Sequence, residues 1–173
     1  NVSSAASDVY KRQIFGDGAG AALFEPNDEE LGLIDEHFRS DGIGRDHLYI
    51  EAGGSMLPAS SETVSNRQHF LRQDGKTVFK FAVSNMSEAT TKLMERNDLV
   101  SEDIDFFVPH QANQRIIDAT AQRAGIKPEK VLSNISSYGN TTAATLPLIL
   151  SDFEDRFKKG DNIIFTAFGG GFT

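Results

Sequence analysis

The alternation of short apolar runs with helical patterns is the feature that most constrains the fold of this chain. Apolar side chains recur at helical spacing in Phe79–Arg96, Gln111–Ala124 and Ala143–Lys158, so three helices are predicted there. The short run Ile104–Val108 predicts a strand that is covered on both faces. A further strand is predicted over Asn162–Ala167, where the chain enters a glycine-rich turn. Strands and helices that alternate in this way indicate an α/β layered fold.

The remaining segments also carry patterns that predict structure. Residues Ile14–Pro26 are mostly small and apolar and end at a proline, which predicts a buried strand with close backbone neighbours. Leu31–Phe38 and Val131–Ile135 are further candidate strands, and Arg39–Gln73 is predicted to be largely loop. We expect Ala143–Lys158 to be the most buried helix, because its apolar stripe and the small residues at its start favour close packing.

Composition limits the classes of function. The 173 residues are enough to bury a core, and the net charge of −8 argues against a nucleic-acid binder. The sequence has no cysteine, which excludes disulfides and thiolate metal sites. His37, His47 and His69 have no partner at ligand spacing, so no metal site is expected. No stretch has the length of a membrane span or the pattern of a signal peptide, so we expect a soluble cytoplasmic protein that binds neither nucleic acid nor a membrane.

Two polar motifs each follow an apolar run and precede a helical pattern. The first is Val108-Pro109-His110-Gln111-Ala112-Asn113, and the second is Tyr138-Gly139-Asn140-Thr141-Thr142-Ala143-Ala144. Taken singly, His110 would be a structural histidine, and the segment around Asn140 would be a turn with a helix cap. Together they offer two neutral hydrogen-bond donors from separate loops, which suits the stabilisation of negative charge on a carbonyl oxygen. The pair therefore predicts oxyanion or enolate chemistry that needs neither a metal nor a hydrolase triad.

These motifs stand in the order and near the spacing of one known family, together with Phe15-Gly16-Asp17-Gly18-Ala19-Gly20-Ala21 and Phe168-Gly169-Gly170-Gly171-Phe172-Thr173. From about Ile14 to the last residue, the sequence resembles the C-terminal half of the β-ketoacyl-acyl carrier protein synthase III enzymes of the thiolase-like superfamily. The resemblance implies an incomplete αβαβα sandwich with a mixed sheet, made of the C-terminal half and the last strand of the N-terminal half. Family members are longer and carry a nucleophilic cysteine in the N-terminal half.

On this basis the chain divides into three parts. Residues 14–26 would be the end of the N-terminal thiolase-like half, and residues 27–173 would be the C-terminal half, truncated before its last strand. Residues 1–13 have no counterpart in the family, and we interpret them as a non-native junction, with a natural disordered tail as the alternative. An intact gene that encodes them in frame would contradict the first interpretation.

The resemblance also assigns roles to individual residues. His110 and Asn140 would be the catalytic pair that holds the thioester carbonyl oxygen, and an asparagine at the second position indicates the initiating type of synthase. For oxyanion stabilisation and substrate positioning, the residues would be Gly170, through its N–H, and Phe168, beside the malonyl carboxylate. The coenzyme A and pantetheine tunnel would be lined by Gly75, Phe79, Ala112 and Asn113. The acidic carrier protein would dock on Lys80, Arg115 and Arg123, although these could equally be scattered solvated charges.

The implied activity is a decarboxylative Claisen condensation of acyl-CoA with malonyl-acyl carrier protein, which gives 3-ketoacyl-acyl carrier protein and initiates fatty-acid biosynthesis. No cofactor is implied apart from these substrates, and the complete enzyme is expected to be a homodimer. Because the chain has no cysteine, we expect this half to be inactive alone. Two alternatives stay open: a related enzyme of a polyketide or quinolone pathway, and a non-catalytic split half that acts as an interaction module.

Overall fold

The computed structural model describes residues 14–29, 31–169 and 172, and these form two compact units. Among the described residues, the first unit contains those up to His37 together with Val83–Ala167. The second unit contains Phe38–Ala82 together with the described residues from Phe168 onward. The interpretation of residues 1–13 as a junction lies outside the described residues.

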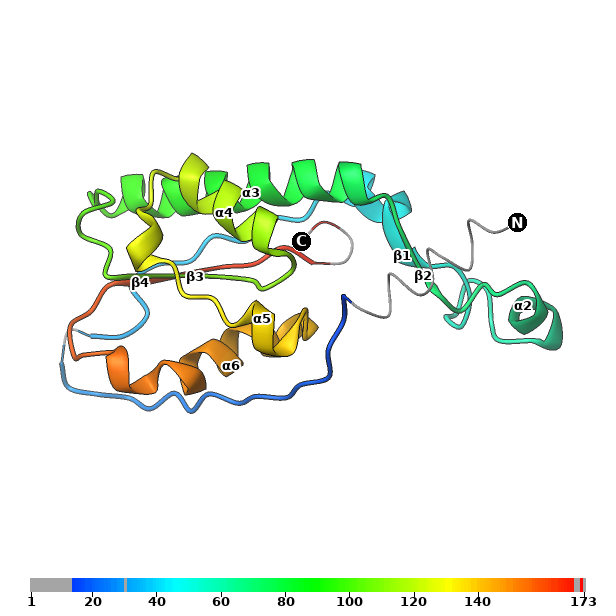
Figure 1. Ribbon diagram of the computed structural model, residues 1–173, viewed down its shortest axis with the longest axis horizontal. Coiled ribbons are helices and arrows are strands. Elements are labelled where there is room, and N and C mark those ends of the chain that lie inside the picture. The colour runs from blue at the N-terminus through cyan, green and yellow to red at the C-terminus, as the bar shows by residue number, and fades with distance from the viewer. Residues whose placement is uncertain (1–13, 30, 170–171, 173) are drawn as a thin grey trace. The chain divides into compact units, whose positions relative to one another are not determined.

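A parallel strand pair forms the middle layer of the first unit (Figure 1). Strand β3 (Phe106–Pro109) pairs with β4 (Ile163–Thr166) in a register that sets Phe107 opposite Ile164. Successive side chains of a strand point to opposite faces. Phe107 and Ile164 therefore join the core on one face, while Val108 joins the core on the other face. Both strands that the apolar runs predict are confirmed.

Residues 83–96 of helix α3 (Gly75–Arg96), which belong to the first unit, and helix α4 (Gln114–Arg123) cover one face of the strand pair (Figure 1). The core on this face consists of buried apolar side chains from helices, strands and connecting segments, namely Met94, Ile104, Phe107, Ala121, Ala124, Ile126 and Ile164. Gly125 ends α4 with a φ of 73°, a backbone conformation that glycine adopts without strain. Both predicted helices are confirmed, although α3 begins earlier and α4 begins later than the apolar patterns suggested.

The opposite face is covered by the short helix α5 (Ile135–Tyr138) and by α6 (Thr145–Asp152) (Figure 1). Its fully buried members are Val108, Leu132 and Ile149, with partly buried aromatic side chains packed around them. The rings of Phe106 and Phe157 meet edge-on, with centroids 5.1 Å apart. Helix–strand–helix layering is thus present in the first unit and confirms the α/β layered fold.

The structure of helix α6 differs from two predictions, one on its length and one on its burial. The predicted helix over Ala143–Lys158 is divided, because 3₁₀ turns η3 (Thr142–Ala144) and η4 (Glu154–Arg156) flank the α-helical part. Thr142 has a φ of 55°, outside the range of a right-handed helix. The prediction that this helix is the most buried is also wrong: α6 buries two residues, whereas α4 buries Ile116, Ile117, Thr120 and Ala121. One face of α6 packs on the strands, and most of its other residues keep partial contact with solvent.

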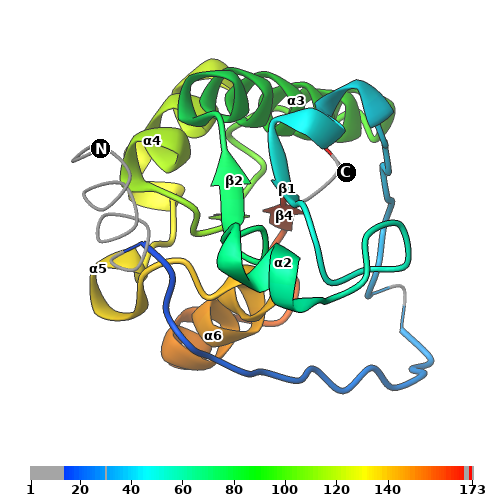
Figure 2. The ribbon, with the colours of Figure 1, turned by 90° about the vertical axis from the view of Figure 1, so that its right-hand side faces the viewer.

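Residues 14–29 form no strand, contrary to the prediction of a buried strand over Ile14–Pro26. The segment runs extended beside α5 and α6 (Figures 1 and 2), and one β-bridge joins Phe15 to Asn140. A strand requires a neighbour that takes up its N–H and C=O groups. Beyond the bridge no such ladder is present among the described residues, and the side chains of Leu23 and Phe24 are 85% and 87% exposed.

The close backbone neighbours that the small residues predicted are nevertheless present. A side chain at position 16 would collide with the carbonyl group of Tyr138, and one at position 20 would collide with the ring of Pro147. Gly16 and Gly20 therefore let the extended segment lie directly against the α5–α6 region. The neighbours are the helices α5 and α6 rather than the strands of a sheet.

The two other candidate strands are wrong as well. Leu31–Phe38 has no regular structure in its described part; Asp35 there accepts a hydrogen bond from Nδ2 of Asn97 and forms an ion pair with Arg96. After the 3₁₀ turn η2 (Pro128–Lys130), Val131 makes a single bridge to Phe107 before the chain enters α5.

The second unit contains a small antiparallel sheet (Figure 2). Strand β1 (Leu48–Ile50) follows the 3₁₀ turn η1 (Gly42–Asp46) and pairs with β2 (Leu71–Gln73). Helix α2 (Ser61–Ser65) lies between the two strands in sequence and begins with a capping box at Ser60. The prediction that Arg39–Gln73 is largely loop is therefore correct only for the residues between η1, β1, α2 and β2. Among the described helices of both units, none combines the length and apolar character that crossing a membrane requires.

We expect Gly44→Ala to destabilise the second unit, because Gly44 is buried under the ring of Phe172 and an added Cβ would overlap ring carbons. Overpacking of this kind costs about 1–3 kcal/mol. The matched control is Gly42→Ala in the same 3₁₀ turn, where the added Cβ meets open space and the change should stay within about 0.5 kcal/mol. Chemical denaturation of the complete protein that contains this half measures both, and equal midpoints for the two variants would contradict the packing argument.

Candidate oxyanion site

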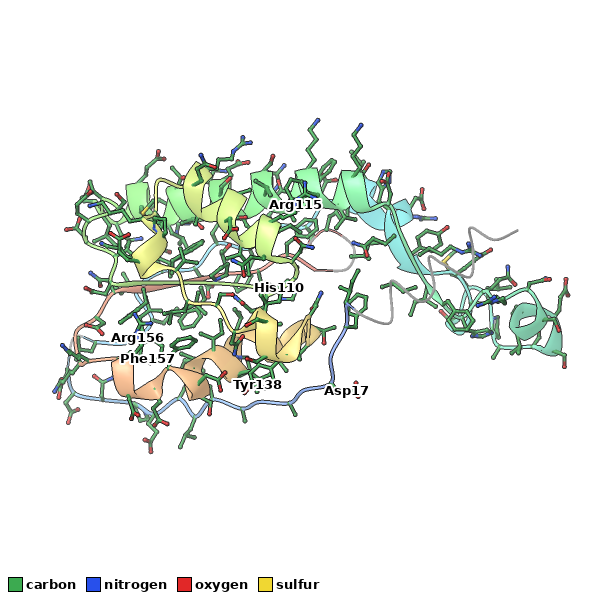
Figure 3. All side chains as sticks on the ribbon, viewed as in Figure 1. Asp17, His110, Arg115, Tyr138, Arg156 and Phe157 are labelled. Atoms are coloured by element: carbon green, nitrogen blue, oxygen red, sulfur yellow. The ribbon has the colours of Figure 1, made fainter. Side chains whose placement is uncertain are left out.

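His110 lies at the carboxyl end of β3, in the loop that leads to α4 (Figure 3). Its backbone N–H donates to the carbonyl oxygen of Thr166 at 2.7 Å, which extends the parallel pairing with β4 by one residue. The Nδ1 atom of its half-buried ring lies 2.7 Å from the hydroxyl oxygen of Thr145, the first residue of α6. Nε2 makes no hydrogen bond within the described part of the chain.

Burial lowers the pKa of the His110 imidazole below its ordinary value of 6.5. Desolvation disfavours the charged form of a group, so the ring stays neutral at pH 7. A neutral imidazole has one N–H, which makes His110 a donor without a positive charge. The neutral donor expected from the motif is therefore supported by the physical surroundings of the ring.

Gln111 explains why α4 begins later than the apolar pattern predicted. Its side chain is fully buried rather than turned outward along a helix, and its Nε2 donates to the carbonyl oxygen of Pro109 at 2.7 Å. Its Oε1 accepts from the hydroxyl group of Ser133 at 2.9 Å and from the backbone N–H of Asn134 at 3.2 Å. The helix then starts after Asn113, whose side chain accepts from the backbone of the first turn. The buried amide thus joins the His110 loop to the segment that leads toward Asn140.

Asn140 is held on both sides of its backbone and by its own side chain. Its N–H donates to the carbonyl oxygen of Ile14, and its carbonyl oxygen accepts from the N–H of Gly16, each at 2.9 Å. Oδ1 accepts from the backbone N–H of Thr142 at 2.9 Å, which assigns the orientation of the amide. Nδ2 is left without a hydrogen bond to any described residue. Asn140 is 9% exposed, so the unused donor belongs to an otherwise well-fixed side chain.

A carboxylate fixes the turn that precedes Asn140. Asp152 in α6 accepts from Nδ2 of Asn134 at 2.9 Å and from the hydroxyl group of Tyr138 at 3.1 Å. The same hydrogen bond raises the pKa of the Tyr138 phenol, since loss of its proton would face the carboxylate. Sequence reasoning missed the roles of Asp152 and of Gln111, although Gln111 lies within the first motif, because both side chains bond residues that are distant in the sequence.

The other predicted site residues are only partly brought together. Ala112 and Asn113 lie beside His110 in the first unit, and Asn113 serves as the N-cap of α4. Arg115 and Arg123 are exposed on the same helix, and Figure 3 shows Arg115 near its start. The second unit contains the other described residues that were predicted to belong to the site, namely Gly75, Phe79, Lys80 and Phe168. The tunnel and the docking patch that would combine the two groups therefore stay predictions.

Two further predictions concern the glycine-rich end. Phe168 is buried within the second unit, where its ring centroid lies 4.9 Å from that of Phe172. The role assigned to Gly170 lies outside the described residues. Across the described residues, no group of three acidic, histidine or cysteine side chains is placed to hold a metal ion.

Comparisons with known proteins find similarity to one family. Residues 94–173 match the family described as 3-Oxoacyl-[acyl-carrier-protein (ACP)] synthase III C terminal. The chain is 56% identical over 160 residues to β-ketoacyl-[acyl-carrier-protein] synthase III 2 of Bacteroides thetaiotaomicron, which covers 92% of this chain and 48% of that protein. It is 54% identical to the synthase III of Phocaeicola vulgatus, with the same coverage. The chain thus spans about half the length of the relatives it matches.

A solved structure shows the same likeness in three dimensions. The crystal structure of 3-oxoacyl-(acyl carrier protein) synthase III, FabH, from Pseudomonas aeruginosa PAO1 superimposes with a TM-score of 0.75 at 35% identity. The superposition covers 94% of this chain and 49% of the Pseudomonas chain. The sequence match, the shared fold and the motifs around His110 and Asn140 lead to one conclusion. The chain belongs to the β-ketoacyl-acyl carrier protein synthase III family, of which it forms the C-terminal half.

Proposed function

We propose that this half provides the enolate-stabilising pair for a decarboxylative Claisen condensation between acyl-CoA and malonyl-acyl carrier protein. The observation that carries the proposal is a pair of side-chain nitrogens without a hydrogen bond to any described residue. They are Nε2 of His110 and Nδ2 of Asn140, and each belongs to a side chain whose other polar atom is already bonded. Such preorganised donors stabilise an oxyanion because they need no reorganisation when the charge develops.

The reaction needs a nucleophile that this sequence does not contain, since it has no cysteine. A cysteine from the N-terminal half of the complete enzyme takes the acyl group from acyl-CoA and releases coenzyme A. Malonyl-acyl carrier protein then loses carbon dioxide, and the electron pair of the broken C–C bond forms an enolate. The enolate carbon attacks the acyl-cysteine carbonyl, the thiolate leaves, and 3-ketoacyl-acyl carrier protein is released.

The neutrality of both donors suits the decarboxylation step. A cation beside the substrate would form an ion pair with the malonyl carboxylate. This would stabilise the substrate before decarboxylation and so raise the barrier to the loss of carbon dioxide. His110 and Asn140 instead add hydrogen bonds to the thioester oxygen, where charge appears in the transition state. Removing one donor of this kind typically costs about 3–4 kcal/mol of transition-state stabilisation.

The remaining parts of the proposal concern partners and location. Lys80, Arg115 and Arg123 are exposed, which supports docking of an acidic carrier protein. The names of the relatives include acyl carrier protein, which supports that carrier protein as the substrate carrier. We propose the initiation of fatty-acid biosynthesis as the role. We propose that the complete enzyme acts as a cytoplasmic homodimer and uses no cofactor apart from its substrates.

His110→Ala and Asn140→Ala should each reduce malonyl decarboxylation by about 10²–10³-fold and leave acylation of the cysteine largely intact. The reason is that the enolate exists only in the second half-reaction. Release of carbon dioxide and formation of labelled acyl-enzyme, measured separately in the complete enzyme, provide the test. His37→Ala is the histidine control and should leave both steps unchanged, whereas equal loss of both steps in the site variants would place the pair in the wrong half-reaction.

The acid sensitivity of the complete enzyme should depend on His110. Its folded-state pKa is lowered, so below pH 6.5 the unfolded chain binds a proton that the folded ring does not. Stability is therefore lost as the pH falls from 6.5 toward the folded pKa, by at most about 1.4 kcal/mol per pH unit for one group. His110→Gln removes this contribution, so the decline in Tm between pH 7 and pH 5 should be smaller in the variant. An equal decline in Tm for the parent enzyme and the variant would show that the ring is not buried in its neutral form.

Arg115→Glu should raise the KM for malonyl-acyl carrier protein and spare acylation by acyl-CoA. A charge at the edge of a docking surface mainly changes the encounter with a charged partner. Lys158→Glu makes the same change of charge at an exposed residue that follows α6, and should have no such effect. Steady-state kinetics at two salt concentrations separate the variants, and similar KM values for both would remove α4 from the docking surface.

A further inference from the structure

The hydroxyl group of Thr145 is placed to control the protonation pattern of His110. Thr145 is 1% exposed and is the first residue of α6. Helix α6 lies on the opposite face of the β3–β4 pair from α4 (Figure 1). Its oxygen lies 2.7 Å from Nδ1 of His110. This is the one hydrogen bond that its side chain makes within the described residues.

The direction of this hydrogen bond follows from where the protons can go. A neutral imidazole carries its proton on one nitrogen and accepts on the other. If Nδ1 of His110 carried the proton, it would donate to Thr145, and the buried hydroxyl proton of Thr145 would then have no acceptor. An unmade hydrogen bond of a buried donor is costly, so the hydroxyl donates to Nδ1 instead. The ring proton then resides on Nε2, the nitrogen without a partner among the described residues.

We propose that Thr145 is a positioning residue that holds His110 in the tautomer with the proton on Nε2. The inference rests on the proposed function in one respect: Nε2 is the atom that donates to the enolate oxygen. The tautomer itself is set by the contact between the buried Thr145 hydroxyl and the half-buried His110 ring, and it can be measured without any substrate.

The position of Thr145 also links the two donors. Asn140, the turn at Thr142 and the start of α6 at Thr145 follow one another within six residues. One short segment therefore carries the amide donor and also fixes the ring that carries the imidazole donor. A change in this segment would disturb both donors, whereas removal of the hydroxyl alone should disturb only His110.

The test uses Thr145→Val, which keeps the shape of the side chain and removes the hydroxyl, in the complete enzyme. Thr145→Ser restores the hydroxyl. The matched control is Thr120→Val: Thr120 is also fully buried, and its hydroxyl has no hydrogen-bond partner among the described residues. Nitrogen-15 NMR of labelled histidine reports the tautomer, with the His110 signals identified by their loss in His110→Gln.

In the parent enzyme we expect an unprotonated Nδ1 and a protonated Nε2. Thr145→Val should give a mixture of tautomers and reduce the decarboxylation rate by roughly tenfold, with acylation of the cysteine unchanged. Thr145→Ser should recover the parent tautomer and most of the rate, and Thr120→Val should match the parent in both measurements.

Two results would overturn the inference: a protonated Nδ1 in the parent enzyme, or a decarboxylation rate in Thr145→Val equal to that of the parent. The first measurement requires no variant that might fail to fold. Failure of the proposed function is distinguishable, because it would appear as full decarboxylation in His110→Ala whatever the tautomer of the parent ring.

Discussion

The parallel pairing of β3 with β4 is the constraint on which the first unit depends. Its two short strands carry apolar side chains on both faces, so helices have to cover each side. The pairing continues past the strand, because the N–H of His110 donates to Thr166. The histidine is thereby fixed at the carboxyl end of a strand, between the layer that holds α4 and the layer that holds α6. In layered α/β proteins this edge of the sheet is the usual place for chemistry.

A second constraint is the fully buried amide of Gln111. A buried polar group has to be hydrogen-bonded, and each polar atom of this side chain has a partner in the backbone or in Ser133. The amide therefore ties the His110 loop to the segment before α5, and Asp152 ties α5 to α6. Asn140 follows α5 in the sequence, so these contacts fix the segment that leads to it. Its position is thus set by buried and partly buried polar groups as well as by apolar packing.

The fold class could be predicted from the sequence, and His110 and Asn140 could be singled out as a candidate pair, because both leave local patterns. Apolar runs and helical spacing located β3, β4, α3 and α4, and the two motifs located His110 and Asn140 just beyond them. The prediction of a strand over Ile14–Pro26 failed for a physical reason. Small apolar residues allow close approach, and Gly16 approaches the carbonyl of Tyr138, but the composition of a segment does not supply a ladder partner.

The sequence by itself determined which side chains could serve as donors, because their chemical type and their place after apolar runs are local properties. Only the tertiary structure decided which atoms of those side chains are available. Thr145 occupies Nδ1 of His110, the N–H of Thr142 occupies Oδ1 of Asn140, and burial keeps the imidazole neutral. Hydrogen-bond direction and desolvation depend on neighbours brought together by folding, so no pattern along the chain could have fixed them.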